Sequence, residues 1–142
     1  MSEQTEFFNG IFSHLEAMPF ASGYSHPCEK DIEEYLDKHK SLFFKQIFDY
    51  ADERNSYLLA EMLHCLNHLD NLIFHKNDIY FLSEKLLASE FFVLRDAAIT
   101  LLETVRGTKA LEILKSHQEN VFYIKRYQET VISELESEKD KS

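Results

Sequence analysis

The sequence is poor in the residues that form sharp turns and covalent cross-links. Its 142 residues include three glycines, two prolines and two cysteines, and tryptophan is absent. An all-β sandwich needs a tight turn about every eight to twelve residues, so this composition excludes one. Two cysteines outside a CxxC pair do not build a disulfide framework either. Long helices joined by short polar links remain as the natural architecture.

The sequence also lacks a secretory signal and a membrane span. Residues 1–6 are acidic and polar rather than basic and apolar, and no apolar run approaches the length of a membrane-spanning helix. The hydrophobic fraction of 44% is high enough to build a core and excludes an intrinsically disordered chain. We therefore expect a single cytoplasmic domain with reduced thiols and no membrane attachment.

Apolar residues recur at spacings of three and four along most of the chain, which predicts about seven to eight amphipathic helices. The first helix is expected to end before Pro19, and residues 19–28 form a loop, either a plain connector or a mobile binding loop. Gly107 is expected to end the helix that carries Leu94. The other expected helix starts or caps are Asp31, Ser41, Asn55 or Ser56, Asn77 or Asp78, Thr108 and Val121.

One stretch of the chain resembles a known repeat family. Residues 90–114, EFFVLRDAAITLLETVRGTKALEIL, are similar to a HEAT-like helical repeat. Leu94-Arg95 stands where that family places an apolar residue followed by arginine, and Ala97 and Ala98 are the small residues that let paired helices approach. Ile124-Lys125 recurs in the Leu94-Arg95 place, whereas Tyr127 and Gln128 stand where small residues are expected.

The resemblance implies an all-α fold of stacked antiparallel helical hairpins in a short right-handed superhelix. Such families mostly bind other macromolecules. In these terms the chain is one domain over residues 1–142, with an N-terminal helix and loop (1–28), acidic helices (29–77), HEAT-like hairpins (78–136) and a charged tail expected to fray (137–142).

Negative charge is concentrated in the first half of the chain. The formal net charge is −10; residues 1–71 carry 13 acidic and 5 basic residues, and residues 72–142 carry 12 and 10. This balance disfavours binding to nucleic-acid phosphates and favours a basic protein partner. A solvated acidic face with no partner is the plain alternative. Acids at Asp49, Asp52 and Glu53 stand near an expected helix end, where the carbonyl dipoles disfavour them, which suggests that a partner retains them.

A helix carrying Glu61, His64, Cys65 and His68 is the sharpest candidate for chemistry, because these residues lie within about two turns. Glu-x-x-His occurs in di-iron bundles, but the second such pair is absent, as is the His-Glu-x-x-His of zinc proteases. No glycine-rich turn is present to build an oxyanion hole. We expect no enzyme, metal or cofactor, and keep a metal-dependent enzyme using Glu61, His64 and His68 as an alternative.

Four tyrosines beside charged residues, near expected helix ends, are candidates either for an interface or for the core. They are Tyr35, Tyr50, Tyr57 and Tyr123.

Size, acidity and helical content together resemble small bacterial immunity proteins, including those of contact-dependent growth inhibition systems. The resemblance implies a protein that neutralises a basic cognate toxin, such as a nuclease, through an acidic surface that steers association. A HEAT-type adaptor with another partner is a further alternative, and self-association is left open. The expected partner-binding residues are Asp31, Glu34, Asp49, Asp52, Glu53, Tyr57 and Glu61.

Overall fold

The computed structural model describes residues 2–141, except for the side chains of residues 140 and 141. Over that range the chain is all-helical, with eight α-helices, two 3-10 helices and no strand, which confirms the expected fold class at this level. The α-helices are α1 (Glu3–Ala17), α2 (Cys28–His39), α3 (Ser41–Gln46), α4 (Ser56–Asn67), α5 (Lys76–Leu87), α6 (Phe92–Val105), α7 (Gly107–Ser116) and α8 (Phe122–Lys141). The 3-10 helices are η1 (Ile47–Tyr50) and η2 (Leu72–His75).

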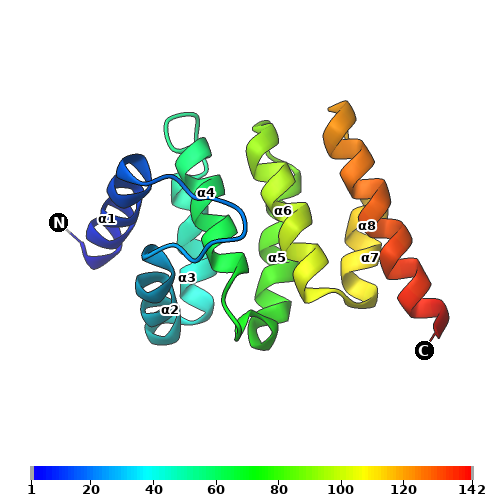
Figure 1. Cartoon of the computed structure of the whole chain (residues 1–142), viewed down its shortest axis with the longest axis horizontal. Helices are drawn as coiled ribbons and strands as arrows, with labels where there is room; N and C mark the ends of the chain where they lie inside the picture. Colours follow the sequence, from blue (N-terminus) through cyan, green and yellow to red (C-terminus); the bar gives the residue numbers. More distant parts are fainter. Residues whose placement is uncertain (1, 142) are drawn as a thin grey trace.

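The helices follow one another along the long axis of the molecule, with the two termini at opposite ends (Figure 1). Helices α4, α6 and α8 lie side by side in the front layer, and α3, α5 and α7 lie behind them (Figure 1). Helix α5 packs against α6 and runs in the opposite direction, and α6 also contacts α4, α7 and α8. Helix α6 is therefore the central element, and all three front helices start at the same edge.

The core changes character along this axis. Near the N-terminus it is aromatic: Phe7 stacks on Tyr35 with 3.8 Å between ring centroids, and Phe8 stacks on Tyr50 at 4.3 Å. These two tyrosines are therefore core residues, because their rings fill the space between α1 and the helices that follow it. Around α6 the core is aliphatic and small, and Ala97 and Ala98 are fully buried.

The expected boundary at Ser41 is wrong, whereas that at Gly107 agrees with the structure. Ser41 is the first residue of α3 rather than its cap, and its hydroxyl donates to Asp78 on α5. Helix α6 ends at Val105 with Arg106 as its C-cap, so Gly107 directly follows the helix end as expected, and it is also the first residue of α7. Arg106 and Gly107 both have left-handed backbone, with φ of 58° and 93°. The Arg106 conformation is held by its guanidinium, which donates to the Glu138 carboxylate on α8.

The C-terminal tail, expected to fray, is helical as far as Lys141. Ion pairs to the preceding helices hold it: Arg106 reaches Glu138 at 2.6 Å and Lys115 reaches Glu136 at 2.9 Å. Residue 142 lies outside the described residues.

The two residues that depart from the repeat pattern on α8 have bridging roles. The Tyr127 hydroxyl donates to Glu103 on α6 at 2.6 Å. The Gln128 amide donates to the carbonyls of Leu114 and His117 at 2.7 and 2.8 Å, which satisfies backbone groups left open at the end of α7. Larger side chains thus replace small ones where α8 must reach its neighbours.

Candidate functional site

The seven expected partner-binding residues lie in three places rather than on one surface. Asp31 and Glu34 line a shallow hollow between α1 and α2. Asp49, Asp52, Glu53 and Tyr57 lie in η1, the link before α4 and the first turn of α4, whereas Glu61 lies in the middle of α4. Helix α2 is at the opposite end of α4 from that link (Figure 1), so the acidic residues do not form one continuous patch.

Asp49 in η1 and Asp52 in the link before α4 both accept hydrogen bonds within the chain, which the sequence argument about these acids did not include. Asp52 accepts a hydrogen bond from the Asn55 backbone N–H at 3.0 Å, and Asp49 accepts one from the Gln4 side chain at 2.8 Å. Asp52 and Glu53 precede the N-terminus of α4, where the partial positive charge of a helix stabilises carboxylates. Their position therefore needs no partner to explain it, although Glu53 stays exposed to solvent.

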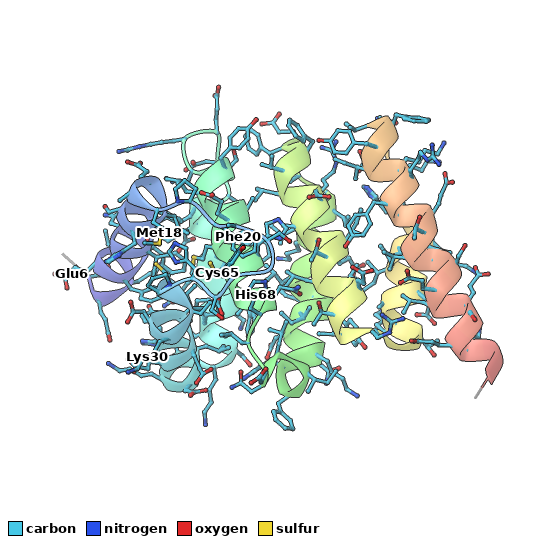
Figure 2. All side chains as sticks on the ribbon, viewed as in Figure 1. Glu6, Met18, Phe20, Lys30, Cys65 and His68 are labelled. Atoms are coloured by element: carbon cyan, nitrogen blue, oxygen red, sulfur yellow. The ribbon has the colours of Figure 1, made fainter. Side chains whose placement is uncertain are left out.

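Glu61 anchors a loop and is not an open acidic contact. The loop over residues 18–27 crosses the front of α4, and Figure 2 shows Phe20, Cys65 and His68 gathered at the crossing. The Phe20 backbone N–H donates to the Glu61 carboxylate at 3.0 Å. The Phe20 ring lies 5.5 Å from the His64 ring, nearly parallel to it, and 5.1 Å from the His68 ring.

Hydrogen bonds at the base of this loop hold it in place and start α2 at Cys28, earlier than the expected Asp31. His26 accepts the Cys28 backbone N–H at 3.0 Å through Nδ1, and its Nε2 bonds the Met18 carbonyl at 2.6 Å. Glu29 accepts the His26 backbone N–H at 2.7 Å and pairs with His68 at 3.0 Å. Of the two expected roles, the connector fits these contacts better than the mobile binding loop.

The same contacts engage two of the candidate metal ligands on α4 with other residues of the chain. Glu61 is engaged by Phe20, and His68 by Glu29. Burial raises the pKa of the Cys65 thiol to about 12, so the sulfur is held as a thiol rather than as a metal-binding thiolate. Among the side chains that the structure describes, up to residue 139, no three of His, Cys, Asp or Glu converge on a point that would hold a metal ion. Glu61 and His68 thus already have partners within the chain.

The most distinctive surface feature lies at the edge where α4, α6 and α8 begin. Tyr57, Phe92, Phe122 and Tyr123, which we call the aromatic edge, come from the first turns of these helices and are 65, 40, 72 and 58% exposed. Tyr57 and Phe92 meet edge to face at 6.4 Å between centroids, and Phe92 and Tyr123 do so at 6.5 Å. Three successive front helices thus place their first-turn rings in one exposed row.

The links that precede these helices carry charge. Asp52 and Glu53 precede Tyr57, and Glu90 precedes Phe92; all three side chains are exposed. At the α8 end the sign changes, because the Arg126 guanidinium lies over the Phe122 ring at 5.7 Å. The link before α4 also carries the exposed Arg54, so acids outnumber bases by three to one beside α4 and α6, whereas the row is basic beside α8.

A buried ion pair fixes the links beneath the row. Arg95 on α6 donates two hydrogen bonds to Glu119, at 2.9 and 3.0 Å, and a third to the Ser89 carbonyl. Glu119 also accepts from the Val121 backbone N–H and bonds His117. Burial alone would raise the pKa of Glu119, but these bonds lower it to about 2. The network joins the links before α6 and α8, and so holds Phe92 and Tyr123 in register.

Sequence reasoning identified Tyr57 and Tyr123 as possible interface residues but missed Phe92 and Phe122. Each phenylalanine lies beside the apolar stripe of its helix and not on it, two positions before Leu94 or Ile124. An aromatic residue off the buried stripe is the signal that identifies them.

Comparisons of the chain with protein-family models, curated proteins and solved structures found no match. Among the described residues, no helix has the length and apolar character needed to cross a bilayer.

Proposed function

We propose that this chain is a protein-binding module that holds a basic partner at the aromatic edge and its flanking acids. The observation that carries the proposal is the row of Tyr57, Phe92 and Tyr123, three exposed rings in mutual contact at one edge of the molecule. Exposed aromatic groups cluster at interfaces because they add large contact area at low entropic cost. Contiguous exposed apolar surface is otherwise rare on proteins that act alone.

In its specific form, the proposal is a cytoplasmic immunity protein that inhibits a cognate bacterial toxin. A net charge of −10 supports this form, because an acidic surface attracts a basic toxin and speeds its encounter. Of the residues expected to bind it, Asp52, Glu53 and Tyr57 lie at the aromatic edge. A HEAT-type adaptor would use the same edge on another basic partner.

We infer that α5–α8 form the scaffold of this module as HEAT-like antiparallel hairpins within a short superhelix. The pairing of α5 with α6 and of α7 with α8 supports this, as does the lateral contact of α6 with α4 and α8. The buried Ala97 and Ala98 lie on the central helix of this arrangement, where close approach needs small side chains.

The test is growth rescue in cells that express the polypeptide encoded beside this chain's gene. If that polypeptide inhibits growth, the wild-type chain should restore growth, and Glu53→Lys with Glu90→Lys should weaken the rescue. All three acids are exposed, but Glu53 and Glu90 are preferred because Asp52 accepts the Asn55 backbone N–H in the link before α4. Reversing them leaves the described hydrogen bonds in place.

The matched control reverses Glu84 and Glu112, two exposed acids on α5 and α7 in the other layer. It changes the net charge by the same amount and should leave the rescue intact. If both double variants rescue equally well, or if the wild-type chain neither binds nor neutralises the neighbouring polypeptide, the immunity proposal is wrong.

A further inference from the structure

We propose that Tyr57, Phe92 and Tyr123 recognise an extended segment of the partner whose alternate side chains are lysine or arginine. This inference deepens the proposed function and rests on it, because it names the chemistry of the segment that the aromatic edge binds. Three independent properties of the row support it: its spacing, its ring chemistry and its charge.

The spacing of the rings matches that of an extended chain. The centroids of Tyr57 and Phe92 are 6.4 Å apart, and those of Phe92 and Tyr123 are 6.5 Å apart. In an extended strand, side chains on one face recur every second residue, about 6.6–6.8 Å apart. A strand laid along the row therefore brings residues i, i+2 and i+4 to the three rings in turn. A helical segment repeats on one face at about 5–6 Å and fits less well.

The ring chemistry favours cations. Aromatic faces carry partial negative charge, and an ammonium or guanidinium group within about 6 Å of the centroid is attracted to them. This chain makes such contacts elsewhere: Arg126 lies 5.7 Å from the Phe122 centroid, and Lys85 lies 4.6 Å from that of Phe81. Tyr57, Phe92 and Tyr123 are exposed, so the partner's side chains can reach them.

The surrounding charge selects a basic protein segment over a nucleic acid. Single strands also stack on aromatic rows, but they need a positively charged groove for their phosphates. Here the links before the first two rings carry the exposed acids Asp52, Glu53 and Glu90 and one exposed base, Arg54, so acids outnumber bases there, within a protein of net charge −10. These carboxylates attract cationic side chains and repel phosphates. The basic side chains are therefore assigned to Tyr57 and Phe92 first, with the segment ending towards Tyr123.

The probe is a synthetic eight-residue peptide that alternates arginine with threonine, titrated to millimolar concentration into the isotope-labelled chain and followed by NMR. A second peptide has the same composition with its four arginines grouped together, and a third carries glutamate in place of arginine. We expect the alternating peptide to bind at least about threefold more tightly than the grouped one, with shifts centred on the aromatic edge, and the glutamate peptide not to bind.

Variants connect the binding to the rings. Tyr57→Ala and Phe92→Ala should each weaken binding of the alternating peptide about three- to tenfold, whereas Tyr57→Phe should keep most of it. Phe74→Ala is the matched control, because Phe74 is 84% exposed on η2, outside the row. Unchanged far-UV circular dichroism checks that each variant is folded.

Four results would overturn the inference: absence of binding, equal affinity for the grouped peptide, equal loss in the Phe74→Ala variant, or tighter binding of oligothymidine. Self-association that the ring variants abolish would overturn it as well, because a second copy would then occupy the row. Growth rescue that depends on Glu53 and Glu90 but not on the rings would reject this inference and leave the proposed function standing. Rescue independent of those acids would reject the proposed function itself.

Discussion

Glu119 is only 6% exposed, and its carboxylate is surrounded by donors from Arg95, His117 and the Val121 backbone. These donors stabilise the ionised form, which is why its pKa falls to about 2 from an ordinary value of 4.5. A lowered folded-state pKa contributes stability above the unfolded pKa, and that contribution is lost as pH falls from about 5 towards 2. By linkage it amounts to about 3 kcal/mol at neutral pH.

We predict that Glu119→Gln lowers the free energy of unfolding at pH 7 by about 2–3 kcal/mol, since the Arg95 side chain loses its buried counter-charge. The loss of stability between pH 5 and pH 3 should also become shallower than in the wild type. Urea unfolding at both pH values measures each effect, with the exposed Glu112→Gln as control. A variant with unchanged stability and an unchanged pH profile would show that the network does not hold the links.

Gly107 and Gly10 are two glycines at which substitution by alanine should change stability in opposite directions. Gly107 has a φ of 93°, and a Cβ there would lie 2.8 Å from the hydroxyl oxygen of Tyr80, which donates to the Arg106 carbonyl. We predict that Gly107→Ala lowers the free energy of unfolding by about 1–3 kcal/mol. Gly10 lies inside α1 with nothing within 4 Å of its added Cβ, so Gly10→Ala should stabilise by about 0.5–1 kcal/mol. Thermal unfolding of both variants checks the two signs, and shifts of the same sign would contradict the account.

Whether the burial of a single residue could be predicted depended on whether it lies on the apolar stripe of its helix. Leu94, Ala97 and Leu101 are buried as their spacing predicts. For Tyr35 and Tyr50 the sequence left both a core role and an interface role open, because a tyrosine off a clear apolar stripe suits either. The Arg95–Glu119 pair was not predictable, since its residues are 24 positions apart and the whole of α7 lies between them.

At the scale of elements, periodicity located the helices well and their ends less well. Helix α2 starts at Cys28 because of hydrogen bonds made by His26, and Ser41 at the start of α3 contacts Asp78 on the distant α5. The loop over residues 18–27 could not be placed from its composition, because its position is decided by Glu61 and by the ring of Phe20.

The loop offers a prediction about His64, which lies beneath Phe20. Burial lowers the pKa of His64, and the nearby Asp96 carboxylate opposes that shift. Phe20→Ala should expose the imidazole to water, so the pKa of His64 should rise towards or above its ordinary value. Proton NMR titration of the imidazole measures this, with Tyr24→Ala as control, because Tyr24 is 74% exposed in the same loop. A pKa of His64 that does not change would show that Phe20 does not shield it.

For the whole molecule, the net charge follows from the sequence, but the positions of the charged residues on the surface could not be predicted from it. Asp31, Glu34 and Glu61 carry the same charge as Glu53, yet Asp31 and Glu34 line a hollow between α1 and α2, and Glu61 binds the loop that crosses α4. The aromatic edge exists only because α4, α6 and α8 start at the same side (Figure 1), which brings together rings from positions 57, 92 and 123. No local pattern in the sequence encodes that alignment.

The central claim is that a basic partner docks at this edge, and the rate of association tests it most directly. The purified chain and the polypeptide encoded beside its gene would be mixed by stopped flow over a range of salt concentrations. We predict that the wild-type rate falls as salt rises, and that Glu53→Lys with Glu90→Lys slows association about tenfold at low salt. Glu84→Lys with Glu112→Lys should stay within about twofold of the wild type. Equal rates for the two double variants would contradict docking at the aromatic edge.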